Sequence, residues 1–164
     1  MRFCLLDRIS SLEADVEIKA VKNVSLAEEY LADHFPEFPV LPGVFMLEAA
    51  TQAAAWLVRL SENYAHSMIT LQEARSVKFT DFVPPGRQLQ ITVEQLSRDG
   101  MLVSFKFQGE VEGRTCVSGR LTLQCSNLAD EDPELAGVDE RLIQYQRQQQ
   151  ALLTRGLTIP SSVT

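Results

Sequence analysis

One apolar segment constrains the fold of this chain more than any other feature. Residues 42–61 open with Pro42-Gly43, and between Val44 and Val58 only three polar side chains interrupt the apolar run: Glu48, Thr51 and Gln52. Proline is tolerated in the first turn of a helix because that position needs no N–H. A helix that is apolar on nearly every side is buried in other structure. The segment therefore predicts a long central helix with the rest of the chain folded around it.

The pattern changes from helical to strand-like after this helix. Four segments alternate in polarity or are rich in β-branched and aromatic residues, and short sequences such as FVPPGR, SRDG and EGR separate them. Two more strands joined by a turn near Ser11-Leu12-Glu13 are expected before the helix. The six expected strands are 3–8, 14–24, 68–79, 88–96, 102–111 and 115–123. Without strand–helix–strand repetition, this order predicts an α+β fold in which an antiparallel sheet wraps around one helix.

The segment between the early strands and the central helix, and the C-terminal part, are less regular. Ser25 and Glu28 have the spacing of a capping box, which predicts a short helix ending before Asp33. Residues 127–137, NLADEDPELAG, are acidic and contain proline, as linkers do. We thus expect a domain at 1–126, a linker at 127–137 and a helical tail at 138–164 that docks weakly or frays.

Composition excludes several classes of protein. The net charge of −7 provides no basic field for nucleic acid or an anionic membrane surface. The three cysteines have no metal-ligand spacing, so neither a metal site nor a disulfide framework is indicated. The first ten residues hold a short apolar run that ends at Asp7, unlike a signal peptide. A soluble cytoplasmic protein is the expectation.

The loop before the central helix holds the candidate catalytic groups. One of only two histidines, His34, lies in HFPEFPVLPG, a loop stiffened by three prolines, and an imidazole there is a plausible base. The helix start at Gly43 offers free N–H groups that suit an oxygen gaining negative charge. Glu48 lies about 8 Å further along the helix axis, where burial favours its protonated form. A base, an acid and an oxyanion site suffice to remove a proton beside a carbonyl and expel a β-hydroxyl.

Structural roles for these residues are also possible. A single loop histidine is more often a hydrogen-bonded structural residue than a catalyst. Glu48 could be a buried polar anchor in a network with Thr51 and Gln52. The residue pattern alone leaves these alternatives open.

Residues 19–57 resemble the 3-hydroxyacyl-acyl-carrier-protein dehydratases of fatty acid synthesis, the FabZ type. That family has a histidine in HFPG, then PxxPG, then a helix with a glutamate followed by a glutamine; these positions hold His34, Pro42-Gly43, Glu48 and Gln52 here. A second stretch, KFTDFVPPGRQLQI at 78–91, resembles a strand-and-turn segment of the same family. The resemblance covers roughly residues 3–126.

The resemblance implies a fold and a reaction. It implies a hot-dog fold and a homodimer, or an oligomer of dimers, in which the histidine of one chain faces the glutamate of the other. His34 would take the C2 proton, Glu48 would protonate the departing hydroxyl, and the substrate would contact Gly43, Val44 and Gln52. The substrate would arrive on the phosphopantetheine arm of acyl carrier protein, and no cofactor or metal would take part.

Four positions depart from the family pattern. Asp33 and Glu37 stand where the family has glycines, and Thr80-Asp81 replaces a basic pair. Carboxylates beside His34 would favour imidazolium, and the lost basic pair would weaken the attraction of an acidic carrier. Two alternatives to the dehydratase therefore stay open. One is a catalytically weak or inactive acyl-binding or partner subunit, and the other is a thioesterase on the same fold.

Overall fold

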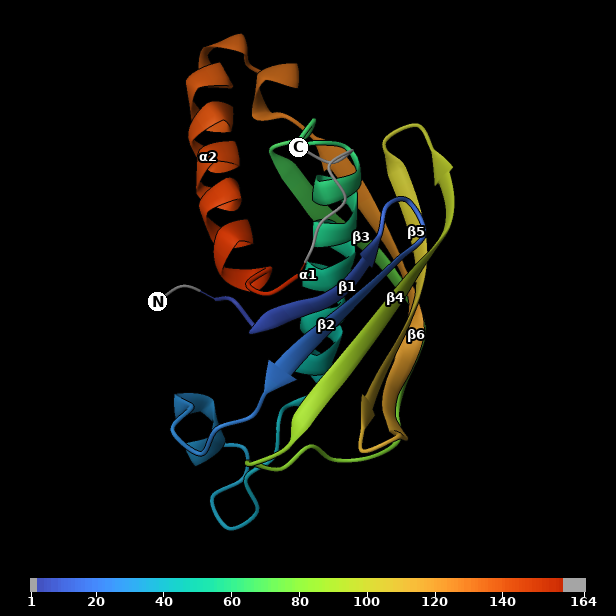
Figure 1. Ribbon diagram of the computed structural model, residues 1–164, viewed down its shortest axis with the longest axis vertical. Helices are drawn as coiled ribbons and strands as arrows, with labels where there is room; N and C mark the ends of the chain where they lie inside the picture. The colour runs from blue at the N-terminus through green and yellow to red at the C-terminus, as the bar shows by residue number, and fades with distance from the viewer. Residues whose placement is uncertain (1–2, 158–164) are drawn as a thin grey trace.

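A single antiparallel sheet wraps around helix α1 (Gly43–Ser61) in the computed structural model, which describes residues 3–157 (Figure 1). The strands are β1 (Arg8–Glu13), β2 (Glu17–Asn23), β3 (Met68–Phe79), β4 (Gln88–Asp99), β5 (Leu102–Val111) and β6 (Arg114–Ser126). Their order in the sheet is β1-β2-β4-β5-β6-β3. The expected α+β architecture is confirmed, because every neighbouring pair is antiparallel and α1 is the central helix.

Turn residues set the register of the long strands. Gly100 and Gly113 have positive φ angles of 56° and 77° in the turns that follow β4 and β5, a conformation that glycine adopts without steric cost. The expected strands 68–79 and 102–111 are confirmed at both ends, while β4 and β6 extend beyond their expected bounds. Tight turns with glycine are thus the reason that the strands after α1 could be predicted from the sequence.

Alanines allow α1 to lie close against the sheet. Ala49, Ala50, Ala53 and Ala54 are fully buried, and Leu57 beside them has no exposed surface. From the sheet side, Phe105 and Phe107 of β5 are also fully buried. The concave face of the sheet and α1 therefore form one hydrophobic core.

The expected first strand was placed wrongly. Residues 3–7 are irregular, β1 begins at Arg8, and the turn lies at 14–16 with Asp15 at a φ of 59°. Leu5 and Leu6 are buried, and the Leu5 N–H donates to Gln52 Oε1 of α1 at 3.0 Å. The apolar run that suggested a strand belongs to a segment that packs on the helix, whereas the real strand is more polar because it lies at the sheet edge.

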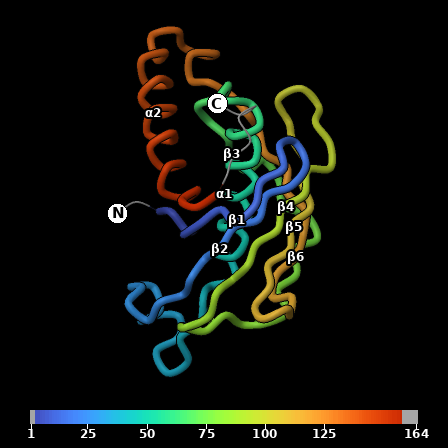
Figure 2. The backbone as a smooth tube through the Cα atoms, in the orientation of Figure 1, coloured from blue at the N-terminus to red at the C-terminus, as the bar shows by residue number. Residues whose placement is uncertain are grey.

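The segment from β2 to α1 forms a loop at one end of the molecule (Figure 2). The expected short helix is only a 3-10 turn, Glu29–Ala32. The capping contacts are present, since Glu28 Oε1 accepts from the Ser25 N–H at 3.0 Å and Ser25 Oγ accepts from the Ala27 N–H at 3.2 Å.

Two short 3-10 turns, Leu128–Asp130 and Pro133–Leu135, lead from β6 into helix α2 (Ala136–Leu153). Figure 1 shows α2 beside α1, running in the opposite direction. Asp139 is buried and accepts from Ser67 Oγ, and the Gln146 side chain donates to the Ser67 carbonyl at 2.8 Å. Tyr64 donates its hydroxyl to Gln150 Oε1 at 2.6 Å. Polar side chains of α2 thus bind partners that lie just after α1, and how strongly this helix docks stays a prediction.

Candidate active site

The loop before α1 holds His34 in one tautomer. His34 Nδ1 lies 3.0 Å from the Val40 carbonyl oxygen, and a carbonyl can only accept a hydrogen bond. Nδ1 therefore carries a proton, and in the neutral imidazole Nε2 is the nitrogen with the free lone pair. The backbone reinforces this geometry, since the Val40 N–H donates to the His34 carbonyl at 3.0 Å. The Phe35 ring stacks on the imidazole with a centroid distance of 4.2 Å. The imidazole is thus oriented as a base at Nε2.

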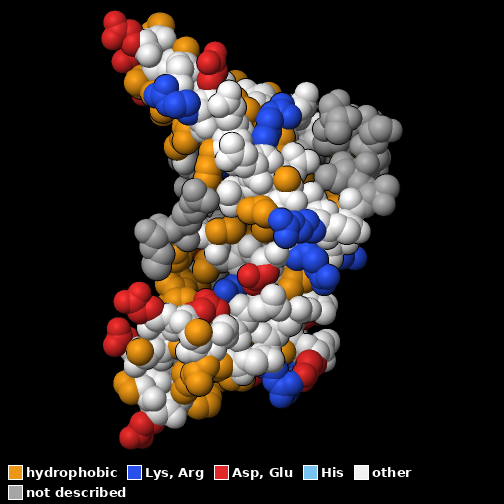
Figure 3. All heavy atoms as spheres, turned by 60° about the vertical axis from the view of Figure 1, so that its left-hand side comes forward, with side chains coloured by type: hydrophobic (Ala, Val, Ile, Leu, Met, Phe, Trp, Pro, Cys, Tyr) orange, Lys and Arg blue, Asp and Glu red, His pale blue; other side chains and the backbone are white. Residues whose placement is uncertain are grey.

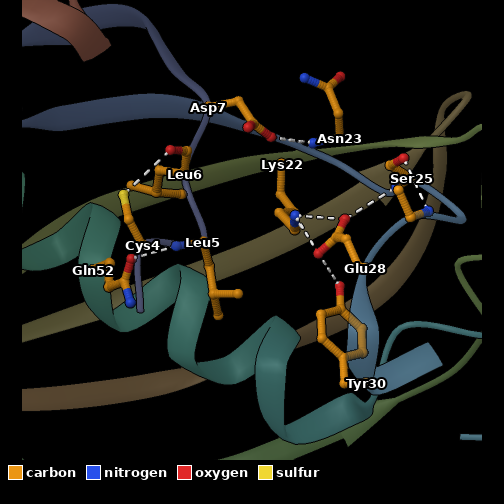
Figure 4. A network of polar contacts seen from close by, with 11 residues as sticks. Cys4, Leu5, Leu6, Asp7, Lys22, Asn23, Ser25, Glu28, Tyr30 and Gln52 are labelled. Atoms are coloured by element: carbon orange, nitrogen blue, oxygen red, sulfur yellow. Dashed lines mark hydrogen bonds and ion pairs between the residues drawn. The ribbon is translucent and has the colours of Figure 1, made fainter. Parts of the chain in front are cut away.

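A polar network fixes the segment that leads into this loop (Figure 4). Lys22 of β2 is buried, and its Nζ lies 2.9 Å from both carboxylate oxygens of Glu28. Tyr30 donates its hydroxyl to Glu28 at 2.5 Å, and the His34 N–H donates to the Tyr30 carbonyl at 3.2 Å. The network therefore connects the sheet to the backbone of His34.

Burial and hydrogen bonding oppose each other at Glu28. Burial alone would raise the pKa of the Glu28 carboxyl, but hydrogen bonds from Tyr30, the Ser25 N–H and Lys22, with the charge of Lys22, hold it below its ordinary value. Burial and then the neighbouring Glu28 raise the pKa of Tyr30. At neutral pH the network thus consists of a carboxylate, an ammonium group and a neutral phenol.

His34 and Gly43 line the same cavity, which has a volume of about 390 Å³. The Gly43 and Val44 N–H groups donate to no other residue within 3–157 and are free to bind an oxygen. A side chain at Gly43 would meet the Phe79 ring at 3.0 Å, so glycine here also makes room for that ring. Val44 is 65% exposed at the helix start. The cavity therefore combines a base with a helix N-terminus.

Glu48 and Gln52 lie one turn apart on α1 and line a different cavity, of about 420 Å³. Gln52 Nε2 donates to Glu48 Oε1 at 2.9 Å and to the Phe3 carbonyl at 3.2 Å, while Gln52 Oε1 accepts from Leu5 (Figure 4). Gln52 thus holds one carboxylate oxygen of Glu48, and Glu48 Oε2 makes no hydrogen bond to another described residue. The glutamate is positioned with one oxygen available for a proton.

Within one chain the two candidate catalytic groups do not meet. The cavity of His34 and the cavity of Glu48 share no lining residue. Neither cavity of the single chain contains both groups. The residues that the sequence singled out thus lie in two places, His34 with Gly43 and Glu48 with Gln52.

The side chains at the positions that depart from the family pattern do not bind the imidazole of His34. Glu37 is exposed and does not line the His34 cavity, and Asp33 lines a separate cavity beside Tyr30. Thr80 and Asp81 do line the His34 cavity, but Asp81 lies 3.8 Å from Arg114 and accepts from its own neighbour Phe82. None of these side chains forms a hydrogen bond or ion pair with His34 within residues 3–157.

Several residues that line the two cavities escaped the sequence analysis. Phe35, Phe79 and Phe82 surround His34, and Trp56 and Arg59 lie on the Glu48 face of α1. The α1 residues could have been found from their helical spacing after Glu48. The aromatic residues carried no such signal, because they come from separate loops and a strand.

Metal-binding and membrane-spanning features were also sought in the described part of the chain. Residues 3–157 contain no group of three or more histidine, cysteine, aspartate or glutamate side chains arranged to hold a metal ion. Neither α1 nor α2 has the length and apolarity needed to cross a bilayer.

Comparisons with known proteins identify relatives over most of the domain. The family described as ApeI-like, ApeI dehydratase, matches residues 10–120. The 3-hydroxyacyl-[acyl-carrier-protein] dehydratase FabZ of Streptococcus agalactiae serotype V is 37% identical over 123 residues, which cover 75% of this chain and 87% of that protein. FabZ of Streptococcus equi subsp. zooepidemicus (strain MGCS10565) is 40% identical over 72% of this chain and 84% of its own length.

A solved structure has the same fold. The dehydratase heterocomplex ApeI:P from Xenorhabdus doucetiae matches with a TM-score of 0.65 and 23% identity, covering 81% of this chain and 90% of that one. At this identity the likeness concerns the fold, and it confirms the expected hot-dog arrangement of a sheet around a central helix.

Proposed function

The chain belongs to the ApeI-like dehydratase family, and on this premise we propose that it converts 3-hydroxyacyl thioesters into trans-2-enoyl thioesters and water. The reaction serves fatty acid or related acyl-chain biosynthesis. One observation supports the role of His34 as the base. The Val40 carbonyl accepts a hydrogen bond from His34 Nδ1, so Nε2 is left as a base beside the free N–H groups at the start of α1.

The reaction follows from the chemistry of these groups. His34 Nε2 takes the proton from C2, and the electron pair of that bond forms the double bond between C2 and C3. The bond between C3 and the hydroxyl oxygen breaks, and Glu48 donates a proton to the oxygen, which leaves as water. The Gly43 N–H stabilises the thioester oxygen while it carries negative charge. The exposed Val44 contacts the substrate beside Gly43, and Gln52 orients the Glu48 carboxyl. Proton exchange with solvent then restores both side chains.

We further propose that the active site is shared between two chains. His34 and Glu48 line separate cavities within one chain, so a second copy must supply the missing group. β3 lies at an edge of the sheet and is free to pair with another strand. Exposed apolar side chains gather over the segment between β2 and α1 in the lower part of Figure 3, where Leu26, Phe35 and Phe38 are all more than half exposed. These features support a homodimer.

The substrate carrier in this proposal is acyl carrier protein, met in the cytoplasm. The relatives named above are dehydratases of acyl-carrier-protein substrates. Lys78 is exposed, forms no ion pair within residues 3–157, and precedes Phe79 at the His34 cavity. Its ammonium group is therefore suited to the phosphate of a phosphopantetheine arm or to a carrier carboxylate.

Turnover assays test this function. The purified protein should interconvert 3-hydroxybutyryl and crotonyl thioesters of acyl carrier protein or coenzyme A. His34→Ala should abolish the activity and Glu48→Gln should reduce it by at least about a hundredfold, whereas Glu140→Gln on the exposed face of α2 should have no effect. A mixture of the two inactive variants should recover part of the activity if the site is shared. Wild-type protein without turnover on either carrier would contradict the proposal.

A partner subunit without catalysis is the second candidate. Thr80 and Asp81, which line the His34 cavity in place of a basic pair, favour it, and the Xenorhabdus relative is described as part of a heterocomplex. In that case the chain should bind acyl thioesters saturably, and binding should survive Glu48→Gln without any product. Release of free acid instead of enoyl thioester would identify a thioesterase.

A further inference from the structure

The cavity that contains Glu48 runs along one face of α1. Its α1 lining residues are Glu48, Thr51, Gln52, Ala55, Trp56 and Arg59. These positions follow one another at helical spacing, so they form a continuous stripe. From Glu48 to Arg59 the stripe covers eleven residues, or about 16 Å along the helix axis. The cavity is therefore long enough to hold part of an acyl chain whose C3 lies at Glu48.

Helix α2 forms the opposite wall. Leu142, Tyr145, Gln146 and Gln149 line the cavity, again at the spacing of one helix face. The two helices run antiparallel (Figure 1). The family match ends at residue 120, before α2 begins. This wall is thus built by a segment outside the part of the chain that the dehydratase family defines.

Arg59 lies at the end of this cavity that is far from Glu48. Its Nε is buried and has no hydrogen-bond partner within residues 3–157. No carboxylate pairs with its guanidinium in this part of the chain, and the nearest compensation is the Trp56 ring, whose centroid lies 5.4 Å from Arg59 Cζ. Burial lowers the pKa of Arg59 to about 10, which leaves it charged at neutral pH. A buried donor without an acceptor is costly, so a ligand oxygen is expected here.

Gln146 presents the complementary group. Its Nε2 donates to the Ser67 carbonyl at 2.8 Å, which directs Oε1 the other way, and Oε1 is buried without a partner within the described residues. Gln146 lies at the same end of α1 as Arg59, because Ser67 follows that end of the helix and the Tyr64 N–H donates to the Arg59 carbonyl at 2.9 Å. The two residues that carry this unpaired donor and this unpaired acceptor therefore line the same cavity.

We propose that this cavity selects acyl chains that carry a hydroxyl group at their far end, which accepts from Arg59 Nε and donates to Gln146 Oε1. A hydroxyl is the simplest group that both donates and accepts. A methyl terminus would leave both polar atoms unpaired, and a carboxylate would satisfy Arg59 but repel the Gln146 oxygen. The inference rests on the proposed dehydratase function, because Glu48 defines the reacting end of the cavity.

The test compares 3-hydroxyacyl thioesters of equal length that end in a methyl, a hydroxyl or a carboxyl group. The measured quantity is kcat/KM for each chain. Wild-type protein should prefer the hydroxyl terminus by about tenfold, as expected for one hydrogen bond to a charged group. Arg59→Met and Gln146→Leu should each abolish the preference, mainly through KM. The matched controls Arg141→Met and Gln148→Leu, on the exposed face of α2, should retain it.

Two further measurements separate the possible failures. Wild type and the controls Arg141→Met and Gln148→Leu should turn over the short 3-hydroxybutyryl thioester equally. Absence of this turnover in wild type would contradict the dehydratase proposal and not the selection. The melting temperature of Arg59→Met should equal or exceed that of wild type, because the substitution removes an unpaired buried donor. Equal wild-type kcat/KM for hydroxyl and methyl chains, or a preference for the carboxyl chain, would overturn the inference. If wild type turns over no thioester, the affinity of the same chains can be measured by calorimetry. A higher affinity for the hydroxyl chain that is lost in Arg59→Met would support the inference, and equal affinities would overturn it.

Discussion

Replacing Glu28 by leucine tests whether the Lys22–Glu28–Tyr30 network supports the His34 loop. The side chain of Lys22 is only 8% exposed and that of Glu28 is 21% exposed. Glu28→Leu would leave the Lys22 ammonium buried without its carboxylate, and Tyr30 and the Ser25 N–H would each lose an acceptor. The substitution therefore removes the partner of a buried charge and not merely a surface ion pair.

The structure sets the size of the expected effect. Breaking a buried ion pair by removing one partner costs about 3–5 kcal/mol, and the residual exposure of Glu28 favours the lower end, about 3 kcal/mol. Lys22→Met keeps an apolar stem and leaves Glu28 bonded to Tyr30 and Ser25, so it should cost about 1 kcal/mol. The double variant leaves no buried ammonium group and should cost about 2 kcal/mol, which gives a coupling energy of about 2 kcal/mol.

Urea denaturation of the four proteins measures these free energies, provided that the slope of the transition is unchanged. The pKa of Glu28 is lowered on folding, so its stabilisation is complete above the ordinary value of 4.5 and is lost as the pH falls through the lower folded pKa. The difference between wild type and Glu28→Leu should accordingly shrink in acid. Because the His34 N–H donates to the Tyr30 carbonyl, kcat should also fall. Additive costs in the double variant, or a cost of Glu28→Leu below about 1 kcal/mol, would refute the reasoning.

Three further substitutions probe the packing. Asp139→Asn should lower the melting temperature near neutral pH. The hydrogen bond from Ser67 and those from the N–H groups after β6 hold the pKa of Asp139 below its ordinary value of 3.8, although burial acts to raise it. The difference in melting temperature from wild type should therefore vanish as the pH falls below that value. Leu57→Ala should cost about 3–4 kcal/mol in urea denaturation, because the side chain is fully buried, and a cost below about 1 kcal/mol would contradict its place in the core. Gly119→Ala would bring a Cβ within 2.9 Å of an aromatic ring and should cost about 2 kcal/mol, whereas Gly137→Ala, with no neighbour closer than 3.7 Å, should leave the melting temperature unchanged or slightly raised.

Local sequence signals predicted much of the fold because their causes are local. The period of α1 and the turns at Gly100 and Gly113 depend on residues close together in the chain, and these elements agree with their expected positions. The misplaced first strand shows the limit of such signals. The apolar run at Leu5 and Leu6 packs on α1, and no local pattern distinguishes that contact from a strand in a sheet.

The candidate site, too, was predicted only in part from the sequence. The motif pointed to His34, Gly43, Glu48 and Gln52, and the structure provides a reason for each, but it also separates His34 from Glu48 within one chain. Their roles in catalysis stay predictions until the variants are assayed. No sequence spacing could reveal that separation, because it depends on which side of α1 each cavity opens.

The sequence by itself determined the order of the elements, the buried helix and the loop that presents an imidazole before a helix start. Tertiary structure alone decided that α2 binds the segment after α1 and that Arg59 and Gln146, each with an unpaired polar atom, line one cavity. The physical reason is that periodicity records which face of an element avoids water. The partner that covers that face, and the polar atoms left without one, depend on side chains brought together from distant parts of the chain.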